Sequence, residues 1–494
     1  MRLGWLVDFS FGLGGQTVSW IEIYGKARKF VWVIFLISLP VTSFPYFPDF
    51  MMGNALVRPL SLYPLMILMI LVTLPGLWRK PLPRTLIPFL AFLLVAVTST
   101  VLALGRGIDP DINVSVKSRA VSTLATLAIG AMFYLTVTIF PESVEDLRFT
   151  LRWLYVGLAV TLFWSTAQSV YILKFNQSYF DLISRIQSYI SIRPLVTFAK
   201  RAAGLAYEPS WFAEQLAFLY MPWLFSSLLS KFTAFTWRWR GLTVEVLLLG
   251  WSTVMLFLTF SRTGLFILVL FVILAFLLWP RTKARGVAKK WKIWLQKVTQ
   301  VGLILVVMGV IIFAVGSQNN YFARMWRYFF PEEETEGTYL YYIAFDQRFV
   351  YWETAYRIFE DFPVLGIGLG NYAFYYDSYL PDRQYRNPEI YLPLVPEDGR
   401  SQIVTVKNMP LRILTETGII GAATFTAFVI AVIGCMLYSY PSMDDEQRFW
   451  GRAGLFGLIA FVPIVFSIDS FAVPNLWVVF GLITASTHIF ARLS

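Results

Sequence analysis

The sequence predicts an all-α polytopic membrane protein with about twelve transmembrane helices and one large loop outside the membrane. Hydrophobic residues make up 57% of the 494 residues and charged residues only 14%, against about 25% charged residues in soluble domains. Apolar runs of about 20 residues, the length that crosses a bilayer, recur along most of the chain. The exception is the segment 317–415, which is rich in aromatic residues and far longer than an ordinary connection between helices.

Short links that contain charged residues, Gly or Pro separate the apolar runs. The predicted spans are 30–47, 59–78, 85–104, 119–140, 152–174, 209–230, 242–260, 264–280, 298–316, 416–438, 452–469 and 473–491. The pair 242–260 and 264–280 is joined by a very short link, so it could also be one long bent helix. Residues 1–25 contain charged residues and several glycines, and we expect an interfacial segment there rather than a cleavable signal peptide.

The distribution of charge predicts the orientation. With a cytoplasmic N-terminus, the basic runs 26–29, 79–84, 231–240 and 281–297 all face the inside, as the positive-inside rule requires. The outside segment 317–409 carries thirteen Asp and Glu against eight Lys and Arg. The net charge of +11 therefore reflects membrane topology and gives no support to nucleic-acid binding. The C-terminus is then cytoplasmic as well.

Three regions follow from this topology. Residues 1–316 hold nine helices and a short outside loop, 175–208. Residues 317–415 form the large outside loop, and residues 416–494 hold the last three helices.

Residue counts exclude several kinds of site. Cys435 is the only cysteine and His488 the only histidine, so a disulfide framework, a Cys- or His-based metal site and a Ser-His-Asp triad are all excluded. Asp109 and Asp111 resemble the paired Asp of metal-dependent glycosyltransferases, but so short a spacing is common by chance. We predict no metal and no other cofactor.

The stretch 193–215, RPLVTFAKRAAGLAYEPSWFAEQ, concentrates charge beside an apolar span. Charged side chains near a bilayer are costly, so the cluster indicates a site. Arginine suits phosphate groups because its planar guanidinium forms paired, charge-assisted hydrogen bonds. Each cation alone could also contact lipid headgroups at the membrane edge. Cations that face outside in this topology include Arg193, Lys200, Arg201, Arg262, Arg348, Arg357 and Lys407.

Glu208 precedes Pro209 and Ser210 at the predicted start of a helix. It could complement the helix dipole or pair with Arg201. It could instead be a general base that deprotonates a sugar hydroxyl. The residues alone leave both roles open.

Within the large loop, aromatic residues at helical spacing predict an amphipathic helix over 345–362. Pro363 and the glycines of GIGLGN (366–371) end it and predict a turn that brings backbone close to the site. Some loop aromatics could stack on sugar rings, although packing within the loop is the commoner role. These are Trp352, Tyr356, Tyr375 and Tyr376.

Four stretches in this order resemble the O-antigen ligase and Wzy-type O-antigen polymerase superfamily of bacterial envelope enzymes. In the first, Arg193 is followed, after ten residues, by GLAYEPSWFA, which begins at Gly204. The other three are LTFSRTGL (258–265), RFVYWETAYRIFEDFPVLGIGLGNY (348–372) and KNMPLRILTETGIIG (407–421). The resemblance implies a GT-C-like membrane glycosyltransferase in the bacterial inner membrane, with a periplasmic loop over the active site. It also implies an undecaprenyl-pyrophosphate-linked oligosaccharide as donor and no metal.

The resemblance further implies roles for individual residues. Arg193, Arg201, Arg262 and Arg348 would hold the pyrophosphate, and Lys200, Lys407 and Asn408 would also contact substrate. Arg193 and Arg348, with Glu208 as the candidate base, are the expected catalytic residues.

One departure from the family bears on the reaction. Ligases that build lipopolysaccharide usually carry a His just before the Asn of the fourth stretch, where this chain has Lys407 before Asn408. This favours a polysaccharide polymerase, whose acceptor is a sugar hydroxyl of another lipid-linked repeat unit. The alternatives are an O-antigen ligase or protein O-oligosaccharyltransferase with the same donor, and a lipid-glycan flippase. Besides membrane lipid, a chain-length regulator protein is a candidate partner.

Overall fold

The protein is described here by a computed structural model. The described residues are 20–47, 56–106, 114–195, 201–230, 232–240, 242–278, 345–381, 390, 403–442 and 444–493. The predicted span 298–316, about half of the large loop, Lys200, Asp109 and Asp111 lie outside this description.

The N-terminal half is a series of helices. They are α1 (Trp20–Ser38), α3 (Leu62–Leu68), η1 (Met69–Thr73), α4 (Leu74–Arg79), α5 (Leu86–Ala103), η2 (Leu104–Arg106), α6 (Val116–Ile139), α7 (Val144–Leu173), α8 (Gln177–Ser188), α9 (Pro209–Glu214), η4 (Gln215–Tyr220) and α10 (Met221–Leu229). The segments η1 and η4 are π-helical turns that continue the helices before them.

The remaining elements are also helical, except for one small hairpin. They are β1 (Arg238–Trp239), β2 (Leu242–Thr243), α11 (Val244–Leu258), α12 (Arg262–Leu278), α16 (Asp346–Asp361), α17 (Tyr372–Tyr375), α18 (Met409–Ser439), α19 (Asp445–Val465) and α20 (Pro474–Leu493). β1 and β2 pair antiparallel.

Six helices of the described residues are long and apolar enough to cross a membrane. They are Leu62–Arg79, Leu86–Arg106, Val116–Ile139, Met409–Ser439, Asp445–Val465 and Pro474–Leu493. The mostly helical architecture and these spans agree with a polytopic membrane protein. Apolar side chains also face outward along them; Ile87 and Leu94 of α5 are 72% and 68% exposed.

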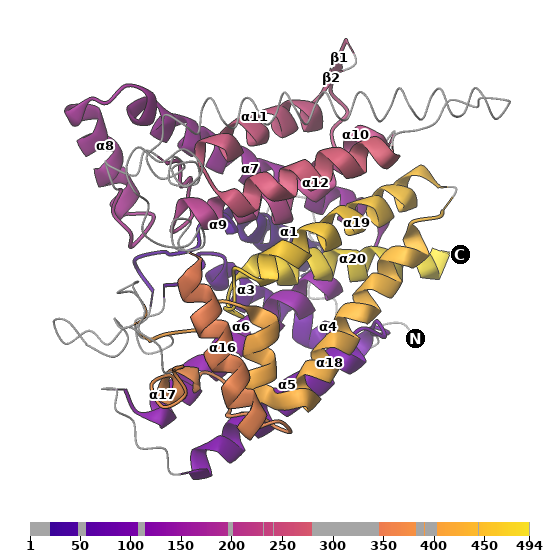
Figure 1. The fold of residues 1–494 in the computed structure, drawn as a ribbon. Helices are drawn as coiled ribbons and strands as arrows, with labels where there is room; N and C mark the ends of the chain where they lie inside the picture. The colour runs from indigo at the N-terminus through magenta and orange to yellow at the C-terminus, as the bar shows by residue number, and fades with distance from the viewer. Residues whose placement is uncertain are drawn as a thin grey trace, which may run out of the picture.

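Helices α11 and α12 are two separate elements, not one bent helix. The chain reverses direction between them, at Phe260, whose φ is 48° (Figure 1). At 15 and 17 residues they are shorter than the six long spans. The reversal brings the LTFSRTGL stretch to one end of the bundle.

Several helices begin earlier than the apolar pattern predicted. α1 starts at Trp20 instead of residue 30, so residues 20–25 are helical, and its charged first turns are joined by the Lys26–Glu22 ion pair at 2.7 Å. α7 starts at Val144 instead of residue 152, because Ser143 caps it by accepting a hydrogen bond from the Asp146 backbone N–H. Polar turns extend these helices beyond their apolar stretches.

Aromatic side chains fill the bundle where α5, α6, α18 and α20 meet. Phe89, Tyr134, Phe428 and Trp477 are buried, and their rings lie in mutual contact, with Phe89 and Tyr134 centroids 4.6 Å apart. Gly130 of α6 lets α20 approach, since a Cβ there would lie 2.5 Å from Trp477 Nε1. The core therefore fixes the last helices against the middle ones.

The segments predicted to face outside lie together at one end of the bundle. In Figure 1, α8, α16 and α17 lie on the left, whereas the β1–β2 hairpin and the C-terminus lie on the opposite side. This arrangement agrees with the relative placement that the charge pattern predicted, although it does not orient the protein in a membrane.

The start of α18 is interrupted, and residues 363–368 fill the break. Gly418 has φ 65° and ψ −170°, a conformation that glycine alone adopts readily. The Ile419 backbone N–H donates to Pro363 O at 2.8 Å, and the Gly368 N–H to Glu416 O at 2.8 Å. The GIGLGN segment is thus bonded into the bundle at the break, where its glycines allow a close backbone approach.

Candidate functional site

Arg193 and Glu208 form an ion pair at the start of α9. Arg193 Nη1 donates to Glu208 Oε2 at 2.6 Å, and the guanidinium lies 5.1 Å from the ring centroid of Tyr207. Ser210 Oγ donates to the other carboxylate oxygen. Glu208 is the N-cap residue of α9 by backbone geometry, but its side chain makes no capping hydrogen bond. Arg193, rather than the expected Arg201, is therefore the ion-pair partner described for Glu208.

Burial raises the pKa of Tyr207, an effect that the charge of Arg193 opposes. The phenol therefore stays protonated at neutral pH. It presents a neutral aromatic face to Arg193, whose side chain remains 37% exposed.

Arg201 and Arg262 lie around the α11–α12 turn. Arg201 Nε donates to the backbone oxygen of Thr259 at 2.7 Å, and the Ala202 N–H donates to Leu258 O. Arg262 is the first residue of α12 and is half-buried. A Cβ at Gly264 would lie 2.9 Å from the Cβ of Ala213, so the absence of a side chain lets this turn pack closely against α9.

Arg348 comes from the first turn of α16 and reaches the link between α19 and α20. Its Nη1 donates to Phe466 O at 2.8 Å, and its guanidinium lies 5.7 Å from the Phe345 ring centroid. Glu214, the last residue of α9, interacts electrostatically with both Arg348 and Glu208. Arg348 and Glu208, the ion-pair partner of Arg193, therefore both act on Glu214.

Lys407 and Asn408 precede α18. Lys407 has φ 51°, its N–H donates to Asp469 Oδ2 at 2.8 Å, and its Nζ lies 5.4 Å from the Tyr351 ring centroid. Asn408 is 1% exposed, and its side-chain oxygen accepts from the Leu411 N–H as the cap of α18. The position of Asn408 is therefore structural, while Lys407 remains half-buried beside the site.

A buried ion pair supports this corner, and we did not select its residues from the sequence. Arg412 Nε donates to Glu416 Oε2 at 2.8 Å, with 7% and 2% of the two side chains exposed. Arg412 also donates to the backbone oxygen of Asp469. The i, i+4 spacing of Arg412 and Glu416 within KNMPLRILTETGIIG was the available signal. The pair fixes the α19–α20 link against the start of α18.

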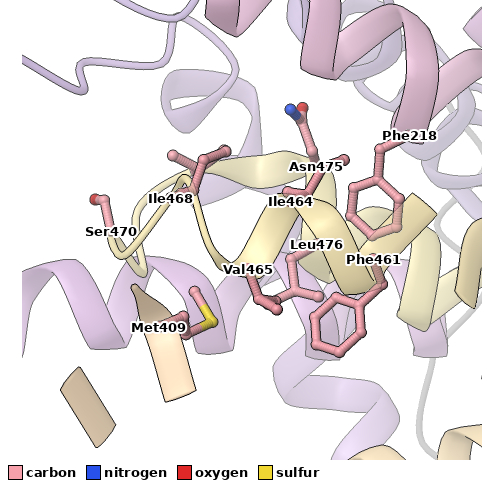
Figure 2. A pocket seen from close by; sticks show the side chains of 10 residues that line it. Phe218, Met409, Phe461, Ile464, Val465, Ile468, Ser470, Asn475 and Leu476 are labelled. Carbon is pink, nitrogen blue, oxygen red and sulfur yellow. The ribbon is translucent and has the colours of Figure 1, made fainter. Parts of the chain in front are cut away.

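A small apolar pocket, with a cavity volume of about 20 Å³, opens between η4, α18, α19 and α20. In Figure 2, Phe218 projects from η4, Phe461 and Val465 from α19, and Met409 from the first turn of α18. Asn475 also lines it, is 3% exposed, and has a side-chain oxygen without a hydrogen-bond partner in the described part of the chain. The pocket lies next to Phe466, the residue that Arg348 contacts.

The loop aromatics divide between core and surface. α16 confirms the predicted helix, but its buried face is formed by Val350, Tyr351, Ala355 and Ile358 rather than by the aromatic stripe. Tyr356 is 51% exposed. The helical spacing of the aromatic residues predicted the helix. It did not predict which face of the helix is buried, because that depends on the neighbouring segments that pack against it. Tyr376, by contrast, is 1% exposed and belongs to the packed loop core.

Comparison with known families places these features in context. Residues 246–426 match the family model described as O-antigen ligase. This confirms the resemblance to the O-antigen ligase and polymerase superfamily, whose members are glycosyltransferase-like enzymes. The matched region contains Arg262, Arg348 and Lys407, while Arg193 and Glu208 lie before it. No individual curated protein matches the chain.

Proposed function

We propose that the chain is a polysaccharide polymerase of the bacterial inner membrane. It would transfer a glycan from an undecaprenyl-pyrophosphate donor to a sugar hydroxyl of a second lipid-linked repeat unit, on the periplasmic side. The observation that supports this proposal is that Arg193 pairs with Glu208 before α9, while Arg348 acts on Glu214 at the end of the same helix. Arg193 precedes α9, Arg262 begins α12 and Arg348 lies on α16.

The arginines would hold the donor pyrophosphate and stabilise the charge that grows on it as the sugar leaves. A single ion pair at 4 Å contributes about 4 kcal/mol at an effective dielectric constant of 20. Several converging arginines could supply much of the catalysis. Glu208 would hold Arg193 in position, since the pair distance is 2.6 Å.

The proposal is tested by incubating purified protein with a lipid-linked repeat unit and separating the products on a gel. A ladder of products is the expected result for a polymerase. A single adduct on lipid core or on a protein would instead identify a ligase or protein O-oligosaccharyltransferase. If the protein flips the lipid-linked glycan in vesicles and forms no product, both the polymerase and the ligase functions are rejected.

Paired substitutions separate the arginines of the site from other outside cations. We expect Arg193→Ala and Arg348→Ala to lose product formation while the protein still folds. Arg185→Ala and Arg357→Ala are matched controls: Arg185 is exposed on α8, and Arg357 pairs with Glu353 at 3.0 Å on the same helix as Arg348. Full activity of R193A or R348A would remove that residue from the mechanism.

A further inference from the structure

Glu214 is a buried carboxylate at the centre of the candidate site. It ends α9, is 4% exposed, and its Oε2 has no hydrogen-bond partner among the described residues. The next turn is π-helical, η4, and places Phe218 in the wall of the apolar pocket. A ligand that fills this pocket would thus come within about one helical turn of Glu214.

Glu208 and Glu214 differ in the hydrogen bonds that their carboxylate oxygens accept. Glu208 accepts from Arg193 through one oxygen and from Ser210 through the other. A general base needs a lone pair free to reach the proton that it removes. Glu214 Oε2 accepts no hydrogen bond within the described residues, whereas each carboxylate oxygen of Glu208 already accepts one.

The charges that face Glu214 fit a proton acceptor next to a bound anion. Burial acts most strongly on the Glu214 carboxyl; of the charged groups, Glu208 repels its carboxylate and Arg348 attracts it. Arg348 also donates to Phe466 O, which follows the pocket residue Val465, so the guanidinium that acts on Glu214 lies near the pocket. An acceptor hydroxyl held between the donor sugar and Glu214 would therefore lie close to the cation that binds the leaving group.

We propose that Glu214, rather than Glu208, takes the proton from the acceptor hydroxyl, an inference that rests on the proposed glycosyl transfer. The acceptor oxygen forms a bond to the anomeric carbon of the donor. The bond from that carbon to the pyrophosphate oxygen breaks, and its electron pair leaves with the lipid pyrophosphate. The hydroxyl proton passes to the Glu214 carboxylate. Glu208 is a positioning residue that acts through Arg193.

Glu214→Gln and Glu208→Gln separate the two roles. E214Q keeps the size of the side chain but cannot accept the proton, so we expect kcat to fall about 100-fold or more. Binding of undecaprenyl pyrophosphate, measured by its effect on Tm, should change less than about threefold. E208Q should mainly weaken that binding and raise KM. Glu353→Gln is the matched control: Glu353 lies on α16, where it pairs with Arg357, and the variant should retain full activity.

Several outcomes would overturn the inference. It is rejected if E214Q keeps more than about a third of the wild-type kcat, or if binding falls as much as turnover. Where E214Q is not recovered folded, Glu214→Asp decides: turnover with a shifted acid limb of the pH–rate profile supports the role, and an unchanged profile rejects it. A wild-type protein that forms no product from the lipid-linked donor would reject the proposed function itself.

Discussion

Asn408 shows how one side chain can join structure to the site. Its oxygen caps α18, and the preceding Lys407 adopts φ 51° with its N–H bonded to Asp469. The cap therefore fixes the backbone from which the Lys407 ammonium projects. This makes Asn408 a residue that acts on the site through helix geometry.

Asn408→Ala and Asn408→Ser test that role. Alanine removes the acceptor and should destabilise the protein by about 1 kcal/mol, whereas serine restores a good cap. We expect N408A to lower both Tm and activity and N408S to keep both close to wild type. A stable but inactive N408S would show instead that the amide itself contacts substrate.

For individual residues, the sequence drew attention to the arginines of the candidate site but not to Glu214. Arg193, Arg201, Arg262 and Arg348 stand out because cations are rare in an apolar chain. Glu214 did not stand out, because a single Glu near the start of a span also fits an interfacial side chain. Its burial depends on the packing of α12 and other distant segments against α9, and no local pattern contains that information.

Among the elements, α18 is shaped by its break at Gly418. A Cβ at this position would lie 2.2 Å from Val364 O, whereas one at Gly434 of the same helix would meet nothing within 4 Å. We expect Gly418→Ala to lower the unfolding free energy by more than about 2 kcal/mol. Gly434→Ala should be neutral or stabilise by up to about 1 kcal/mol. Thermal unfolding in detergent measures both, and equal Tm values for the two variants would contradict the role of the break.

The glycines of this region were visible in the sequence, but their partners were not. GIGLGN predicted a turn close to other backbone, and Gly366 does approach Thr415 O, at 2.5 Å from its would-be Cβ. The backbone that this turn approaches is the interrupted start of α18. The sequence does not reveal this partner, because the two segments lie about fifty residues apart. The helix 345–362 was predictable for the opposite reason, since its pattern is local.

A second group of contacts joins α1, α4 and the link between α6 and α7. Glu142 accepts from Lys80 at 3.0 Å and from Arg28 at 2.5 Å. Burial pushes the pKa of Glu142 upward, but the hydrogen bonds and charges of Lys80 and Arg28 outweigh this, so its pKa is lowered. Such a carboxyl stabilises the fold above the pKa of the unfolded chain, about 4.3, and the contribution is lost as pH falls through the lower folded-state value.

Glu142→Gln should therefore lower Tm at pH 7, and the difference from wild type should close as the pH falls below about 4. Because 45% of the Glu142 side chain is exposed, the contribution should not exceed about 1 kcal/mol. Glu360→Gln, an exposed carboxylate on α16, is the control and should show no such dependence. A gap that widens in acid would contradict the assignment.

For the whole molecule, composition predicted the class and the charge pattern predicted a topology. The described helices support a polytopic membrane protein, and the reversal between α11 and α12 agrees with two separate spans. Span boundaries were less predictable, because polar capped turns extend α1 and α7 past their apolar stretches. What composition cannot give is the side of the membrane on which each end of the bundle lies.

Cysteine labelling measures that orientation directly. In a Cys435→Ala background, Arg185→Cys places a thiol on α8 and Arg238→Cys places one on the β1–β2 hairpin; both positions are exposed and lie at opposite ends of the bundle. The positive-inside rule predicts that a membrane-impermeant maleimide labels R185C in cells whose outer membrane has been opened. R238C should be labelled only after the inner membrane is permeabilised. Reversed labelling would place the arginine site in the cytoplasm and remove the periplasmic reaction, while labelling of both positions from one side would contradict the arrangement of the helices.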